Sequence, residues 1–86
     1  MVCSVEISMY PLKENFKPSI IAFIKNLRKY PFIKVTTNGM STQVFGEYKR
    51  VMNSIHTEME NTFINENSVV FNLKVINSDL EEKPNF

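Results

Sequence analysis

The chain has 86 residues, enough for one small domain, and a formal net charge of +1, which gives no electrostatic reason to expect nucleic acid or an anionic membrane as a partner. Hydrophobic residues make up 43% and charged residues 22%, a mixture that excludes a disordered chain. No apolar run is long enough to cross a bilayer, no signal peptide is evident, and the single cysteine, Cys3, cannot form an internal disulfide. We therefore expect a cytoplasmic protein that does not bind membranes.

The first third of the chain predicts a strand followed by a helix. Apolar and polar residues alternate over residues 2–10, which is the period of a strand with one buried face, and Pro11 marks its end. Asn15 is a candidate N-cap and Pro18 suits a first helical turn. Apolar residues then recur at helical spacing, and we expect this helix to end at Tyr30.

The next segment, residues 33–45, predicts a β-hairpin. Asn38-Gly39 lies between two alternating runs and favours a two-residue type I′ turn, in which Thr37 faces Met40. This register places two sets of side chains on opposite faces. The apolar face would carry Ile33, Val35, Thr37, Met40, Thr42 and Val44, and the other face Lys34, Thr36, Ser41, Gln43 and Phe45.

The second half of the chain predicts a helix and a last strand. Apolar residues follow helical spacing from Tyr48 to Phe63, and alternation returns over residues 69–76. The element order is βαββαβ, which predicts an α+β, ferredoxin-like fold: a four-stranded antiparallel sheet of order 4-1-3-2 with two helices on one face. We expect this single domain to span residues 1–77, and residues 78–86 to form a loose C-terminal tail.

Polar side chains are expected to gather on the sheet face that the helices leave open. That face mixes hydroxyl and amide groups with aromatic and aliphatic ones, which suits an oligomer interface, a small-molecule pocket or both. Neutral donors and acceptors suit a heteroaromatic ligand, and Glu6 could accept hydrogen bonds from an amino group or neutralise a cationic ring. The candidate ligand-binding residues are Glu6, Ser8, Tyr10, Thr36, Asn38, Ser41, Gln43 and Phe45.

No catalytic or metal-binding set is evident in the sequence. His56 falls on the outer face of the second helix, so neither a Ser-His-Asp triad nor a histidine metal site is expected. Cys3 is expected to be a small buried residue rather than a nucleophile. We expect neither an enzyme nor a bound metal or cofactor. One alternative to ligand binding remains: a regulatory or oligomerisation module that uses the same face and takes no small molecule.

Two segments, "SVEISMYPL" and "TTNGMSTQVFGEY", together with the βαββαβ order, resemble the YkoF-like family of thiamine-binding proteins. The most specific pieces are the Ser-x-Tyr-Pro that begins at Ser8 and the Ser-Thr-x-x-x-Gly that ends at Gly46. The resemblance implies association through the sheets into a homo-oligomer, a dimer or tetramer, and binding of thiamine or its hydroxymethylpyrimidine moiety. Some members carry two such domains, so a single domain would need a partner subunit. Phe45 stands where another branch of the family has an acidic residue.

Overall fold

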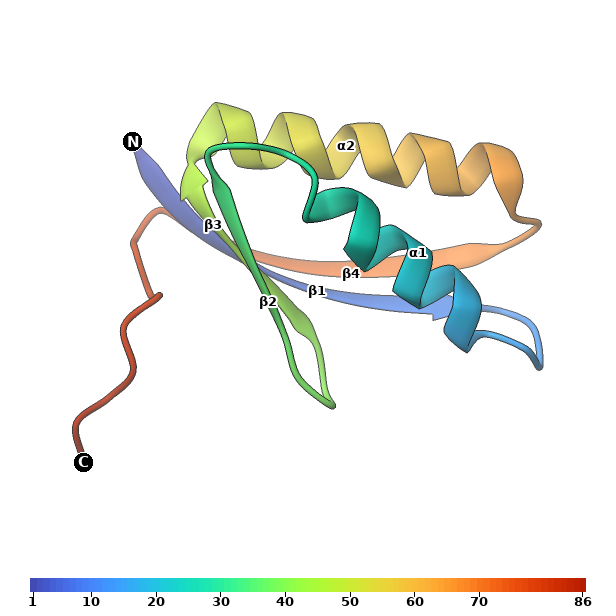
Figure 1. Ribbon diagram of the computed structural model, residues 1–86, viewed down its shortest axis with the longest axis horizontal. Helices are drawn as coiled ribbons and strands as arrows, with labels where there is room; N and C mark the ends of the chain where they lie inside the picture. The colour runs from blue at the N-terminus through green and yellow to red at the C-terminus, as the bar shows by residue number, and fades with distance from the viewer.

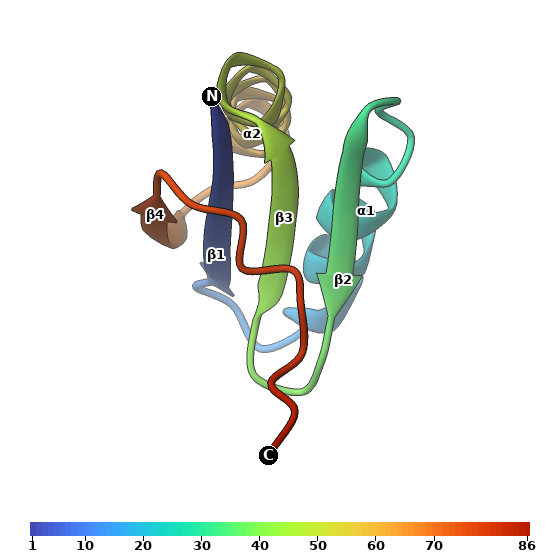
Figure 2. The ribbon, with the colours of Figure 1, turned by 90° about the vertical axis from the view of Figure 1, so that its left-hand side faces the viewer.

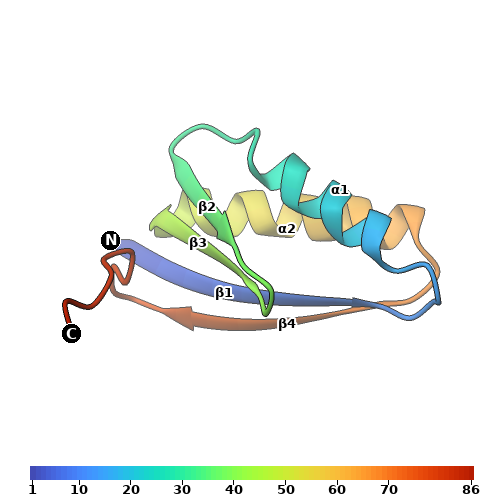
Figure 3. The same ribbon diagram turned by 60° about the horizontal axis from the view of Figure 1, so that its bottom comes forward.

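The computed structural model describes residues 1–86 and contains one four-stranded antiparallel sheet with both helices on the same side of it (Figure 1). The elements in chain order are β1 (Val2–Pro11), α1 (Lys17–Leu27), β2 (Ile33–Thr37), β3 (Thr42–Glu47), α2 (Tyr48–Asn65) and β4 (Val69–Ile76). The strands lie in the order β2-β3-β1-β4, which is the predicted order 4-1-3-2 read from the other edge. The ferredoxin-like prediction is therefore confirmed. Figure 3 brings forward the side of the sheet without helices, called the open face below.

The hydrophobic core lies between the sheet and the two helices. Strict alternation along β1 sends every second side chain of this central strand into it. The buried apolar cluster comprises Cys3, Val5, Ile7, Met9, Phe23, Leu27, Val44, Val51 and Ile55. Burial raises the pKa of the Cys3 thiol, which fits the predicted packing role. Because the core lies on one face of the sheet, the strand residues that point the other way form the open face.

The first helix differs from its predicted ends at both termini. Its N-cap is Phe16 rather than Asn15, and no side chain caps it, although Pro18 sits in the first turn as predicted. The helix ends at Leu27, short of the predicted end at Tyr30, because the Tyr30 amide bonds to the Leu27 carbonyl (3.2 Å) in a tighter turn. The proline that follows limits how far a helix can run but does not fix its last residue.

The second helix follows β3 without a connecting loop. The Glu47 carboxylate accepts a hydrogen bond from the Arg50 amide (3.1 Å) and so caps the first turn, and this contact lowers the pKa of Glu47. Val51 and Ile55 point into the core, and His56 is exposed on the outer face as predicted. Neither this helix nor α1 is long and apolar enough to cross a membrane.

The hairpin turn is wider than predicted, and the predicted register is wrong by two residues along β3. Thr37 pairs with Thr42 rather than with Met40, which leaves a four-residue loop over 38–41. Neither Asn38 nor Gly39 has the positive φ that a type I′ turn requires. Instead the Asn38 side-chain oxygen accepts from the amides of Met40 (2.9 Å) and Ser41 (3.1 Å). A shift of two residues keeps each strand residue on its predicted face, but Met40 leaves the apolar face and is 91% exposed.

Candidate ligand site on the open sheet face

The strand register places one open-face residue of each strand in line across the sheet. Partners opposite one another share a face, so these lines form continuous rows of side chains. The polar row consists of Lys74, Glu6, Gln43 and Thr36 from β4, β1, β3 and β2. The neighbouring end row consists of Ile76, Ser4, Phe45 and Lys34, from the same four strands. The open face therefore offers a charged and amide-bearing row beside a row with apolar and aromatic side chains.

A chain of hydrogen bonds joins the polar row and ends on one carboxylate. Thr36 Oγ1 donates to Gln43 Oε1 (3.1 Å), Gln43 Nε2 donates to Ser41 Oγ (2.8 Å), and Ser41 Oγ donates to Glu6 Oε2 (2.8 Å). On the other side, Lys74 Nζ lies 3.5 Å from Glu6 Oε1. We call these five residues the Glu6 network. The hydrogen bonds run in one direction, from Thr36 through Gln43 and Ser41 to Glu6, so the network fixes the position of the Glu6 carboxylate.

The Glu6 network also holds its carboxylate in the ionised form. The Ser41 hydroxyl and, to a smaller extent, the nearby Lys74 ammonium lower the pKa of Glu6 below its ordinary value. The Glu6 side chain remains 45% exposed and that of Lys74 82% exposed. Glu6 is therefore a negative charge that is oriented by neighbours and still reachable from solvent, and Lys74 can leave it at little cost.

Ser41→Ala is expected to raise the pKa of Glu6 more than Lys74→Gln does, because the hydroxyl is the larger of the two influences. The folded-state pKa of Glu6 lies below the unfolded value, so its stabilising contribution is present above the unfolded pKa and is lost as pH falls through the folded pKa. NMR titration of the Glu6 carboxyl carbon in the two variants and the unchanged protein measures the order. A larger rise in Lys74→Gln would contradict this account of the network.

A hollow of about 250 Å³ lies over the two rows. Its lining combines a carboxylate, an amide and an ammonium group with aromatic and aliphatic side chains, and comprises Ser4, Val5, Glu6, Gln43, Phe45, Lys74, Ile76 and Leu80. This volume is slightly below the smallest typical ligand pockets, which measure about 300 Å³. The hollow, called the sheet hollow below, is the right size for one or two rings rather than a large cofactor.

The structure divides the eight predicted site residues between two places. Glu6, Gln43 and Phe45 line the sheet hollow, while Ser41 and Thr36 belong to the network beside it. The other predicted residues, Ser8, Tyr10 and Asn38, line a smaller hollow of about 160 Å³ at the hairpin loop, which Ser41 also borders. The division arises because β1 pairs with β3 only as far as Ile7 and Thr42. Beyond that point the hairpin loop and the end of β1 are no longer joined by the ladder.

Three lining residues of the sheet hollow, Ser4, Lys74 and Ile76, are not among the predicted site residues. The register that aligns them with Glu6 and Phe45 could have found them from the sequence. Leu80 is different, because it lies in the predicted tail, where no periodic pattern indicates a position. Only the folded chain places it against the sheet.

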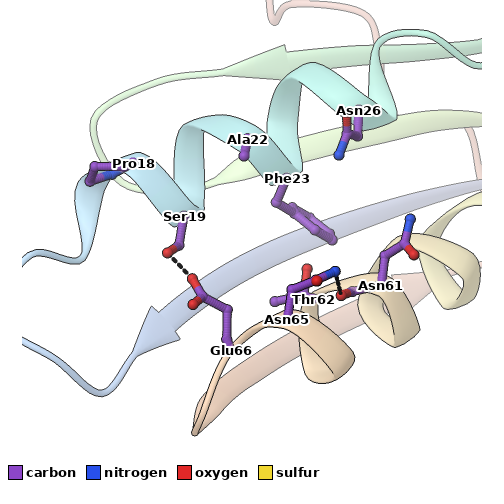
Figure 4. Close-up of a pocket in the computed structure, with 9 residues that line it drawn as sticks. All are labelled: Pro18, Ser19, Ala22, Phe23, Asn26, Asn61, Thr62, Asn65 and Glu66. Carbon is purple, nitrogen blue, oxygen red and sulfur yellow. Dashed lines mark hydrogen bonds between the residues drawn. The ribbon is translucent and has the colours of Figure 1, made fainter.

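A larger hollow of about 400 Å³ lies between the two helices (Figure 4). It is lined by amide side chains, but its polar groups bind one another. Ser19 donates to Glu66, Lys13 also binds Glu66 (3.1 Å), and Asn65 donates to the Asn61 carbonyl (2.8 Å). The Ser19 and Lys13 contacts lower the pKa of Glu66. The Glu66 side chain is only 20% exposed, against 45% for Glu6, so Glu6 is the more accessible of the two oriented carboxylates and the open face is the better candidate site.

Comparison with known proteins gives matches of structure only. No protein-family model matches the chain, and no curated protein matches it. A hypothetical protein of Methanocaldococcus jannascii superimposes with a TM-score of 0.78 at 22% identity, over 98% of this chain and 88% of that one. A Thermotoga maritima protein provisionally named for thiamine biosynthesis or salvage gives 0.78 at 18% identity, over 87% and 82%. A Bacillus cereus domain of unknown function, DUF77, gives 0.76 at 11%, over 91% and 77%. At these identities the matches show a shared fold.

Proposed function

We propose that this protein is a non-catalytic binding protein for a small heteroaromatic ligand, thiamine or its hydroxymethylpyrimidine moiety, held on the open face of a homo-oligomer. The observation that carries the proposal is the oriented, ionised Glu6 at the wall of the sheet hollow. The resemblance of two sequence segments to thiamine-binding proteins supports it. The name of the Thermotoga maritima structure, which mentions thiamine biosynthesis or salvage, agrees with it.

The chemistry of the hollow suits such a ring system. An exocyclic amino group on a pyrimidine donates hydrogen bonds, and the Glu6 carboxylate accepts them without a proton transfer. The same negative charge would neutralise the thiazolium ring of intact thiamine. Phe45 and Ile76 supply aromatic and aliphatic surface beside these polar groups. Binding and orientation need nothing more, so the proposal includes no catalytic step.

An oligomer would complete the cover of the ligand. A single open sheet face cannot enclose most of a ligand's surface, which is the usual condition in a binding pocket. On the half of the open face towards the end of β1, Tyr10 is 52% exposed and Val70 is 48% exposed, and the two are paired across the strands. We propose that a second subunit packs its sheet against this apolar half.

Calorimetric titration with thiamine and, separately, with hydroxymethylpyrimidine tests the proposal. We expect micromolar or tighter binding of at least one of them, at one molecule per subunit, from a sample whose oligomeric state is measured in parallel. Binding of neither by a folded oligomer would contradict the proposal. That result would favour the alternative function, an interaction module that uses the same face for subunit contact alone.

A further inference from the structure

The segment that follows β4 turns back across the open face instead of leaving the domain. We call residues 77–82 the C-terminal strap. Figure 2 shows it passing in front of β1 and β3 on its way towards the β2 side of the sheet. The side-chain contacts agree, because Ser4 on β1 binds Ser78 and Leu80, and Lys34 on β2 forms an ion pair with Glu81. The strap therefore runs along the end row.

Ser4 attaches the strap with both functions of its hydroxyl group. Its Oγ donates to the Ser78 carbonyl (2.7 Å) and accepts from the Leu80 amide (2.8 Å). Ser4 points to the open face, yet it is only 6% exposed, so the strap is what removes it from water. The strap also has a turn of its own, in which the Glu81 amide donates to the Asp79 side chain (3.0 Å). These contacts give the strap a defined path over the sheet.

Leu80 is the strap residue that reaches the sheet hollow. It lines the hollow together with Phe45 and Ile76 of the end row, and its amide is bound to Ser4 of the same row. Leu80 is 58% exposed, so much of its apolar surface is not covered by the protein itself. A ring placed against Glu6 would bury part of that surface, which is favourable in proportion to the area removed from water.

We infer that the C-terminal strap is a wall of the ligand site, that Leu80 is its contact residue, and that Ser4 is the positioning residue that holds it there. The inference rests on the proposed function, because it concerns the same hollow. It assigns the ligand an environment with three parts: the Glu6 network on one side, Phe45 and Ile76 beneath, and Leu80 above the end row. The strap and a partner subunit would cover different halves of the open face.

Two truncations and two substitutions test the strap. Removal of residues 78–86 and the change Leu80→Ala are each expected to weaken binding of thiamine or hydroxymethylpyrimidine about tenfold. Removal of residues 83–86 alone is the matched control, since it shortens the tail without touching the strap, and its affinity should be unchanged. Ser4→Ala should weaken binding and also speed hydrogen exchange at the Leu80 amide, which loses its acceptor. Rapid Leu80 exchange already in the ligand-free, unchanged protein would overturn the inference.

The outcomes separate this inference from the proposed function. If the unchanged protein binds ligand and removal of residues 78–86 leaves the affinity the same, the strap is not part of the ligand site, and the proposed function stands. If that truncation tightens binding, the strap covers the site rather than forming it, and the inference is overturned. If the unchanged protein binds neither compound, the proposed function fails and the assigned role of the strap fails with it.

Discussion

Gly46→Ala is expected to lower the free energy of unfolding by about 2 to 3 kcal/mol. This is the largest effect on stability that we predict. Gly46 has a φ of +154°, a conformation that other residues rarely adopt. An added Cβ would lie 3.0 Å from the Phe32 carbonyl oxygen and 3.2 Å from Val51 Cγ2. Val51 cannot move easily, because it is fully buried in the core.

The Phe32 backbone is constrained as well. Phe32 has a φ of 68°, unusual for a bulky residue, and its ring lies 4.2 Å below the Arg50 guanidinium group. The next residue, Ile33, pairs directly with Gly46 across β2 and β3. Gly46 is therefore packed between the start of β2 and the first turns of α2, and a side chain there must displace one of them.

Gly39→Ala is the matched control for Gly46→Ala. Gly39 lies in the hairpin loop, has no positive φ, and has no heavy atom within 4 Å of an added Cβ. Chemical denaturation should show a large loss of unfolding free energy for Gly46→Ala and a change within about 0.5 kcal/mol for Gly39→Ala. A large loss of unfolding free energy in Gly39→Ala would instead support the type I′ turn that the Asn-Gly pair predicts.

Glu6→Gln is expected to weaken thiamine binding about a hundredfold, the largest effect on affinity that we predict. The substitution keeps the shape of the side chain and removes the charge on which the Glu6 network converges. Thiamine should lose more affinity than hydroxymethylpyrimidine, because only thiamine carries a fixed positive charge. Calorimetry with both compounds measures the two losses.

The control for Glu6→Gln is Glu60→Gln, which removes the same charge from α2. Glu60 is exposed, lies on the helix rather than on the sheet, and does not line the sheet hollow. The affinity of Glu60→Gln for both compounds should match that of the unchanged protein. Equal losses in Glu6→Gln and Glu60→Gln would mean that the loss of any negative charge weakens binding, and the site would have to be placed elsewhere.

The periodicity of the sequence was sufficient to predict the fold. Alternation in β1 and helical spacing in α2 indicate which side chains face the core, and the βαββαβ order with right-handed crossovers then predicts the ferredoxin-like arrangement. The same signal could not determine the hairpin register, because a shift of two residues preserves every face. The decisive contacts were those of the Asn38 side chain, which accepts two loop amides and stabilises a wider turn. Propensity rules for Asn-Gly describe backbone conformation and do not include these side-chain hydrogen bonds.

The candidate site was predictable only where it depends on strand pairing. Glu6, Gln43 and Phe45 lie on known faces of adjacent strands, so their meeting follows from the sheet order. Ser8 and Tyr10 lie farther along β1, past the end of its ladder with β3, and this depends on the register that the sequence did not determine. Leu80 could not be predicted, since its place is set by contacts of an irregular segment with Ser4.

The most direct test of the central claim, that the open face binds the ligand, is an NMR titration of the backbone amides with hydroxymethylpyrimidine. We predict that the shifted amides cluster on β1 around Glu6, on β3 around Gln43, and at Leu80 in the C-terminal strap, while the amides between Ser19 and Asn26 of α1 stay unchanged. Shifts confined to the groove between α1 and α2, or no shifts at all from the folded protein, would contradict the claim.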